Sequence, residues 1–253
     1  MEELQGVFNS MIIRVQRAQE MKTEFVSLTA HQLRTPLSAI KWSTQMLLDG
    51  DEGPLAKNQA ELLSKSLLAT NRMIRIINDL LNVTRIEEGR YLYHPTFQQI
   101  VDIVKSMVES YRETAEQKKI SLDLKLPQKK IPRILVDVEK IQLAVQNLLE
   151  NALHYTPKGG RVTVEVSHDT KEVQISFIDT GIGIPQEQQH RVFEKFFRAA
   201  NARKVDTEGS GLGLYLAHNI VETHGGKSWF ESQEGKGSTF TFSLPFKGEN
   251  TKF

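Results

Sequence analysis

The chain has 253 residues, enough for one large domain or two ordinary ones, and its 39% apolar and 25% charged residues exclude a disordered chain. The 32 basic and 31 acidic residues leave a formal charge of +1, so we expect no nucleic-acid partner. The absence of cysteine excludes disulfides, thiolate metal sites and cysteine nucleophiles.

No segment of the chain is predicted to cross a membrane. The longest run without Asp, Glu, Lys or Arg is the 13 residues Gly209–Val221, which include three glycines. A spanning helix needs about 20 apolar residues. Glu2 and Glu3 also give the N-terminus the wrong charge for a secretory leader. We therefore expect this fragment not to span a membrane, although a longer parent protein could.

Two long helices joined by a glycine-containing loop at Asp49–Pro54 are predicted for the first part of the chain. The first carries a heptad seam, formed by Val26, Ala30, Leu33, Leu37, Ile40, Thr44 and Leu47. The second, at about 55–88, carries two adjacent apolar stripes. One consists of Leu63, Leu67, Ile74, Ile77 and Leu81, the other of Leu62, Ala69, Met73, Ile76, Leu80 and Val83. One hairpin cannot bury stripes this wide, so we predict a homodimer with a four-helix bundle.

Residues from about 91 onward alternate between helix and strand patterns. We predict helices at 98–118, 139–155 and 212–223, and strands at 121–126, 134–136, 162–166, 173–178, 227–232 and 238–244. The predicted fold class is thus α plus α/β: an antiparallel helical hairpin that dimerises into a four-helix bundle, followed by an α/β sandwich.

His31 is predicted to point about 140° away from the seam and therefore into solvent. Thr35 follows one helical turn later, within side-chain reach. Pro36 removes a backbone hydrogen bond, at a cost of about 3 kcal/mol in a helix interior, which indicates a local bend. These features alone favour an ordinary exposed histidine beside a tolerated kink.

Two glycine-rich segments follow in the second part. Asp179 ends a predicted strand and precedes Gly181 and Gly183, where a buried carboxylate could accept a hydrogen bond from an exocyclic amine such as that of adenine. The run 209–213 opens a helix, and its glycines would let backbone amides approach phosphate. An ordinary turn is the competing interpretation of each segment.

The predicted helix before these glycines has a polar side, which consists of Asn147, Asn151, His154 and Tyr155. Amide oxygens suit a magnesium ion that also bridges phosphates, and Tyr155 could pack on a base. In isolation, the same pattern fits a plain amphipathic helix equally well.

Taken in order, these segments resemble the sensor histidine kinases of two-component signalling, over about residues 20–245. The matching segments are 25–37 (phospho-acceptor box), 147–155 (asparagine box), 179–183 and 209–213 (glycine boxes), 193–198 (phenylalanine box) and 235–240 (final hairpin). Each motif alone is ambiguous, but all of them in this order are specific.

The resemblance implies three regions: the end of a signalling helix at 1–20, a dimerisation and histidine-phosphotransfer domain at 21–90, and an ATP-binding domain of the Hsp90, gyrase and MutL type at 91–248. It implies a kinase that uses ATP and Mg²⁺ to phosphorylate His31 and passes the phosphoryl group to an aspartate of a response-regulator receiver domain. A cytoplasmic location is expected, within a membrane-anchored parent or without one.

The resemblance also assigns roles to individual residues. The catalytic set is His31, Gln32 and Thr35, with Thr35 orienting a water for regulator dephosphorylation. Asn151 would be the magnesium ligand, and residues from about 186 to 210 would form a mobile lid. The implied nucleotide-binding set is Asn147, Asn151, His154, Tyr155, Asp179, Gly181, Gly183, Lys195, Arg198, Gly209, Gly211, Leu212 and Gly213.

Two positions depart from the family pattern. Gln32 stands where an acidic residue usually follows the acceptor histidine, and His154 stands where lysine is frequent. Glutamine cannot take up a proton at neutral pH. Gln32 therefore keeps one alternative open, a nucleotide-sensing scaffold or phosphatase without strong kinase activity. A second alternative is an ATPase or serine kinase that shares only the nucleotide domain, but the segment from His31 to Pro36 argues against it.

Overall fold

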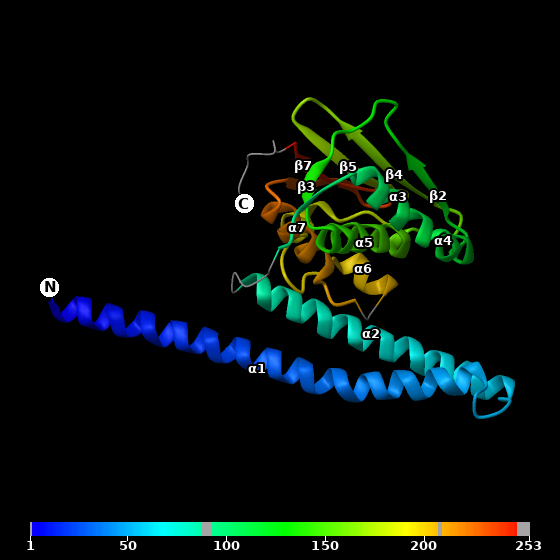
Figure 1. Ribbon diagram of the computed structural model, residues 1–253, viewed down its shortest axis with the longest axis horizontal. Coiled ribbons are helices and arrows are strands. Elements are labelled where there is room, and N and C mark those ends of the chain that lie inside the picture. The colour runs from blue at the N-terminus through cyan, green and yellow to red at the C-terminus, as the bar shows by residue number, and fades with distance from the viewer. Residues whose placement is uncertain (1, 88–92, 207–208, 247–253) are drawn as a thin grey trace. The chain divides into compact units, whose positions relative to one another are not determined.

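The computed structural model describes residues 2–87, 93–206 and 209–246, and the chain packs as two compact units, Met1–Tyr91 and Leu92–Phe253 (Figure 1). Across the described residues, no helix combines the length and the apolar content that a membrane crossing requires. Each unit has its own buried apolar residues.

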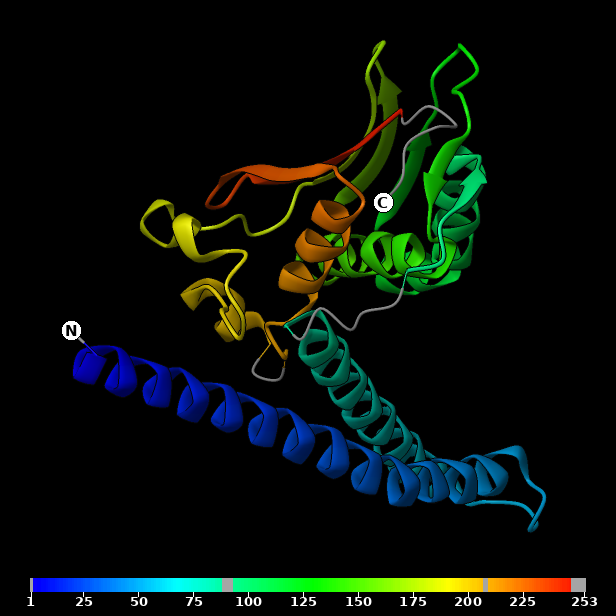
Figure 2. The ribbon, with the colours of Figure 1, turned by 60° about the vertical axis from the view of Figure 1, so that its left-hand side comes forward.

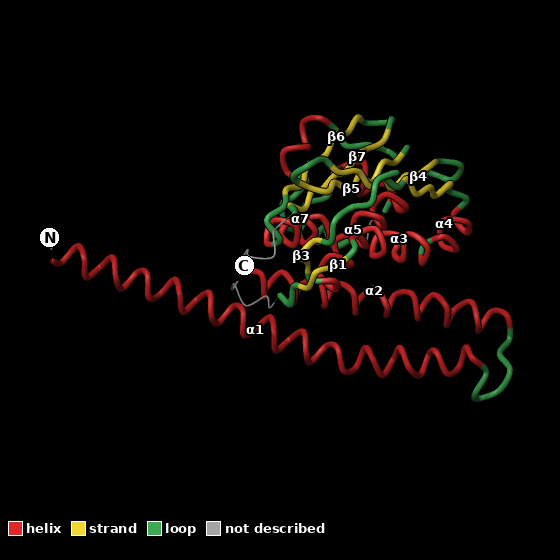
Figure 3. Tube along the Cα trace, turned by 45° about the horizontal axis from the view of Figure 1, so that its top comes forward, coloured by secondary structure: helices red, strands yellow, loops and turns green. Residues whose placement is uncertain are grey.

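The first unit is the predicted helical hairpin. Helix α1 (Glu2–Asp49) continues through Pro36 and packs along α2 (Lys57–Glu87), as Figure 3 shows. The contact is apolar at Ala30, Ile77 and Leu81, with Leu37 packed against them. At its edge, Arg34 Nη2 donates a hydrogen bond of 2.7 Å to Asn78 Oδ1.

The hairpin covers only part of its apolar surface. Ala30 and Thr44 of the seam are buried, whereas Leu33 and Ile40 are 48% and 47% exposed. On α2, Leu62 of the second stripe is 66% exposed. A single chain thus leaves much of the seam and of one stripe in contact with solvent. This exposure is expected of two helices that belong to a larger helical bundle.

The second unit is built on a mixed five-stranded sheet of order β2-β4-β5-β7-β6. Its strands are β2 (Ser121–Lys125), β4 (Arg161–His168), β5 (Glu172–Asp179), β7 (Gly237–Pro245) and β6 (Lys227–Gln233). The pair β2–β4 is parallel and the other pairs are antiparallel.

Helices cover one face of this sheet (Figure 2). They are α3 (Ile100–Ser110), α4 (Arg112–Lys118), α5 (Val138–Tyr155) and α7 (Gly213–Thr223). Their apolar sides meet the inner side chains of the strands, among which Phe177 and Phe242 are fully buried and stacked at 6.3 Å. The α/β sandwich predicted from the sequence is confirmed.

Several elements differ from the sequence prediction. The helix predicted at 98–118 divides at Tyr111, whose hydroxyl donates a hydrogen bond of 2.5 Å to Glu150 of α5. The short strand β1 (Thr96–Gln98), which pairs with β3 (Ile134–Val136), was not predicted. Neither were the 3-10 helix η1 (Gln186–Arg191) and the helix α6 (Ala200–Val205). Three residues are too few to show the alternation of a strand, and six are too few to show the period of a helix.

Candidate functional site

The residues of the candidate phospho-acceptor lie on α1. His31, Gln32 and Thr35 are all exposed, and Thr35 follows His31 by one helical turn. The exposure arises because the apolar seam turns toward α2 and leaves this side of α1 in solvent. The imidazole is therefore accessible to a reaction partner.

Asp179 is buried because of its position in β5. Side chains of this strand alternate, so Asp179 shares the inner face with Val173, Ile175 and Phe177 and is only 8% exposed. Its Oδ1 accepts backbone hydrogen bonds from Gly181 at 2.8 Å and Ser238 at 3.2 Å. Within the part of the chain that the structure describes, Oδ2 accepts no hydrogen bond. One carboxylate oxygen is thus anchored and the other is available.

Burial raises the pKa of Asp179 to about 6, although the two backbone hydrogen bonds oppose the shift. The carboxylate is ionised at neutral pH, and its charge is poorly solvated. A ligand that donates a hydrogen bond to Oδ2 would compensate for that lost solvation. The site thus favours an amine donor.

The first glycine box forms the wall beside this carboxylate. A Cβ at Gly181 would lie 2.6 Å from Asp179 Oδ1 and 2.7 Å from the Tyr155 carbonyl. The next amide, of Ile182, donates a hydrogen bond of 3.2 Å to that carbonyl. Gly183 has a φ of +61°, and a Cβ there would overlap the Gln233 carbonyl. No side chain fits here, so the glycines bring the end of β5 against the end of α5.

One more member of this wall lies in the final-hairpin motif at 235–240 but was not in the predicted nucleotide-binding set. Gly237 has a φ of +112°, and a Cβ there would overlap the Asp179 carbonyl. The following amide, of Ser238, donates to the carboxylate itself. The first residues of β7 thus help to hold Asp179, and only the β5–β7 register brings them there.

Helix α5 brings Asn147 to the second glycine box. The Asn147 side chain donates a hydrogen bond of 2.9 Å to the Leu143 carbonyl within the helix. Its Oδ1 faces Gly213, where a Cβ would come within 2.7 Å of it. Asn151 is half-buried one turn later on the same side of α5. Two residues 66 positions apart in the sequence, Asn147 and Gly213, are thus in direct contact.

The phenylalanine box packs against the second glycine box. The Phe196 amide donates to the Gly211 carbonyl at 3.0 Å, and a Cβ at Gly211 would lie 2.7 Å from the Phe196 backbone. Leu212 is fully buried beneath this contact. Lys195 lies with its Nζ 4.8 Å from the centre of the Tyr215 ring.

Asp206, which the motifs did not indicate, contacts two of the predicted nucleotide-binding residues. Its Oδ2 lies 3.1 Å from His154 Nε2 and 3.5 Å from Arg198 Nη2. Arg198 also donates from Nη1 to the carbonyl of Gly209 at 3.1 Å and from Nη2 to the Asp206 carbonyl.

The contact between His154 and Asp206 is a hydrogen bond of a neutral imidazole at pH 7. Partial burial lowers the pKa of His154, and the nearby carboxylate of Asp206 only partly reverses that shift. The stronger cation of the cluster is thus Arg198, which is 10% exposed.

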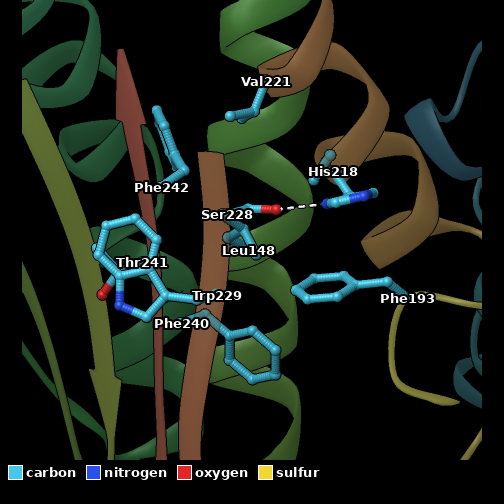
Figure 4. A pocket seen from close by; sticks show the side chains of 10 residues that line it. Leu148, Phe193, His218, Val221, Ser228, Trp229, Phe240, Thr241 and Phe242 are labelled. Carbon is cyan, nitrogen blue, oxygen red and sulfur yellow. Dashed lines mark hydrogen bonds between the residues drawn. The ribbon is translucent and has the colours of Figure 1, made fainter. Parts of the chain in front are cut away.

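A small apolar cavity lies between α5, α7 and the β6–β7 hairpin (Figure 4). Phe193 stacks on His218 at 4.8 Å, and His218 Nδ1 lies 2.6 Å from Ser228 Oγ. None of the predicted nucleotide-binding residues lines this cavity. The stacking of Phe193 on His218 attaches the start of the phenylalanine box to α7.

Two family models match the chain. The model described as "Histidine kinase-, DNA gyrase B-, and HSP90-like ATPase" matches residues 136–248, and the "His Kinase A (phospho-acceptor) domain" matches residues 21–89. All of the nucleotide-binding residues predicted above lie within the first match, and His31 lies within the second.

The sequence is also similar to curated proteins that are described as sensory kinases. The chain is 34% identical over 240 residues to the sensor histidine kinase WalK of Bacillus subtilis, a match that covers 92% of this chain and 38% of WalK. It is 35% identical over 236 residues to the adaptive-response sensory kinase SasA of Crocosphaera subtropica, covering 91% and 61%. The chain thus spans less than two thirds of the length of either relative.

The fold also matches a solved structure. Full-length ShkA in complex with AMPPNP aligns with a TM-score of 0.72 and 24% identity, over 88% of this chain and 46% of that one. This likeness concerns the fold alone.

Proposed function

We propose a function from the premise that this chain belongs to the sensor histidine kinases of two-component signalling, whose phospho-acceptor and ATP-binding domains it carries in order. The chain transfers the γ-phosphoryl group of ATP to His31. It then passes that group to an aspartate of a response-regulator receiver domain.

One observation carries the nucleotide part of the proposal: a buried, ionised Asp179 with one anchored and one available oxygen, beside a wall of glycines. The available oxygen suits the exocyclic amine of adenine, and the glycines hold the backbone close beside the carboxylate. The second glycine box and Arg198 supply backbone amides and a cation for the phosphates.

The transfer step at His31 is a substitution at phosphorus. A ring nitrogen of His31 attacks the γ-phosphorus, the bond from phosphorus to the bridging oxygen of ADP breaks, and the imidazole loses one proton. Helix α1 holds the exposed imidazole in position for the attack. Arg198 and the amides of the second glycine box would neutralise the charge that develops on the phosphates. Little other covalent chemistry is required of the protein.

Magnesium would be held by the Asn151 side-chain oxygen together with the phosphates of the nucleotide. The described residues contain no group of three or more His, Asp or Glu side chains that could hold a metal ion. A single amide oxygen fits an ion that keeps several waters and bridges phosphates, and such an ion offsets their negative charge.

The test is incubation with ATP labelled in its γ-phosphate. We expect a label on the protein that acid removes and base does not, and its loss in His31→Ala. A label that survives acid would instead indicate a hydroxyl acceptor and contradict the proposal.

Gln32 supports a second candidate, a scaffold or phosphatase with weak kinase activity. Its exposed amide cannot accept the His31 proton, and general-base help is worth about 10²–10⁴-fold. If proton removal limits transfer, Gln32→Glu will raise the initial rate of labelling within that range. An unchanged rate in Gln32→Glu, together with no label in the unmodified chain, would favour the second candidate.

A further inference from the structure

His224 is buried at the C-terminal end of α7, outside all of the recognised motifs. The side chain is 1% exposed, and the edge of the Tyr93 ring packs on it with centroids 5.3 Å apart and planes at 81°. A buried imidazole in such a place must have both ring nitrogens satisfied.

Two hydrogen bonds that His224 makes with other described residues fix its tautomer. Nδ1 lies 2.7 Å from the Ile220 carbonyl, which can only accept, so Nδ1 carries the hydrogen. Nε2 lies 3.1 Å from the Asp137 amide, which can only donate, so Nε2 presents a lone pair. The ring is therefore neutral and joins the end of α7 to the residue that precedes α5.

Asp137 is itself the N-cap of α5. Its Oδ1 accepts from the Lys140 amide at 3.1 Å, and its Oδ2 accepts from the His94 amide at 2.8 Å. If α7 slid along α5, the hydrogen bond between His224 and Asp137 would therefore break. Asp137 caps the helix that carries Asn147 and Asn151.

The second contact between the same helices lies at the candidate site. Gly213, at the N-terminal end of α7, packs against Asn147 so closely that a Cβ would come within 2.7 Å of Oδ1. At 1.5 Å per residue, the step from Gly213 to His224 is about 16 Å and the step from Asn147 to Asp137 about 15 Å. Because these two distances nearly match, antiparallel α5 and α7 make the His224–Asp137 contact and the Gly213–Asn147 contact in the same register.

We propose that His224 is a positioning residue: it fixes the register of α7 against α5 and so holds the second glycine box at Asn147. Apolar side chains between two helices tolerate small slides, whereas a hydrogen bond tolerates a few tenths of an ångström. This inference deepens the proposed function, because it concerns the nucleotide site assigned above.

The test compares His224→Leu, which fills the space without a hydrogen bond, with His224→Gln, which retains a donor and an acceptor. Without nucleotide, the amide resonances of Gly213 and Asn147 should move in the leucine variant and return toward their original positions in the glutamine variant. Affinity for an ATP analogue should fall about tenfold in the leucine variant, the effect of one lost buried hydrogen bond.

Ile220→Val is the matched control, because it truncates a fully buried side chain of α7 and keeps both hydrogen bonds. It should lower the melting temperature and leave the Gly213 and Asn147 resonances in place. The proposal is overturned if these resonances stay unmoved in His224→Leu, or if Ile220→Val moves them as far. Because the resonances are measured without nucleotide, they test the register even if the chain binds no ATP.

If His224→Leu does not fold, the same proposal can be tested by following the Gly213 amide and the His224 ring nitrogens during an acid titration of the unmodified chain. Among the described residues, the ionisable side chain of Tyr93 packs on the ring, and Asp137 meets the ring through its backbone amide. A protonated Nε2 cannot accept from the Asp137 amide, so the Gly213 resonance should move with the same midpoint as the His224 ring nitrogens. A ring that titrates without this movement overturns the proposal.

Discussion

Asp179 shows how one residue can weaken a fold while building its site. Between about pH 4 and 6 the folded chain holds a proton that the unfolded chain releases, because the pKa of Asp179 is raised from 3.8 to about 6. The free energy of unfolding therefore falls as pH rises through this window. Above pH 6 the ionised carboxylate keeps the full cost of up to about 3 kcal/mol.

Asp179→Asn should consequently abolish binding of an ATP analogue and raise the melting temperature at pH 7.5. Asparagine keeps an oxygen for the Gly181 and Ser238 amides but loses the charge that burial penalises. Calorimetric titration and thermal unfolding of the same samples measure both effects. Unchanged affinity would place adenine recognition elsewhere, and a lower melting temperature would contradict the desolvation argument.

Asp206 would compete with the phosphates of a nucleotide, because it contacts both His154 and Arg198. Asp206→Asn should strengthen binding of an ATP analogue about fivefold, in line with about 1 kcal/mol for a partly exposed ion pair. Calorimetry at fixed ionic strength measures the change. Glu194→Gln is the control, since it removes an exposed acid that pairs with Arg191 at 2.8 Å. Weaker binding in Asp206→Asn would show that Asp206 supports the site.

At the scale of elements, α1 and α2 each carry more apolar surface than their mutual contact covers. The first stripe of α2 faces α1 through Ile77 and Leu81, whereas Leu62 of the second stripe stays largely exposed. A second hairpin would bury the second stripe and the exposed part of the seam. The pattern supports the predicted homodimer, which stays a prediction.

Leu62→Glu should therefore turn the dimer into a monomer, because it places a charge within the interface stripe. Leu68→Glu is the matched control, since Leu68 is 76% exposed and lies about 120° from that stripe on the same helix. Sedimentation velocity at several concentrations separates the two variants. A dimeric Leu62→Glu, or an equal effect of both changes, would assign the interface to another face.

At the scale of the whole molecule, the chain must also act on a second protein, the receiver domain proposed as its partner. His31 and Thr35 share an exposed part of α1, so the surface that accepts the phosphoryl group would also face the partner's aspartyl phosphate. A hydroxyl one turn from the histidine could orient the attacking water.

Thr35→Ala should slow dephosphorylation of the regulator by roughly 10²-fold, the cost of losing the orientation of one reactant. Melting temperature and nucleotide affinity should not change, because Thr35 is exposed. Ser43→Ala, which removes another exposed hydroxyl of α1, is the control. Equal rates of phosphate release from the regulator in the two variants would exclude Thr35 from this reaction.

Periodicity alone determined the long elements of this protein. The seam from Val26 to Leu47 and the alternation from Val173 to Ile178 both span enough residues to show their period, and both elements are found where they were predicted. Chemistry-bearing residues at turns, such as Asp179 with Gly181 and Gly183, were also visible in the sequence, because no other residue types serve such a turn beside a buried carboxylate.

Only the tertiary structure decided which distant residues meet. The Ser238 amide reaches Asp179 through the β5–β7 register, Asp206 reaches His154 and Arg198 through the path of the chain after α6, and His224 reaches Asp137 through the packing of α7 on α5. None of these contacts leaves a local pattern, because hydrogen bonds between distant segments depend on where the chain returns in space. The sequence therefore predicted the reacting groups, and the fold supplied the residues that hold them.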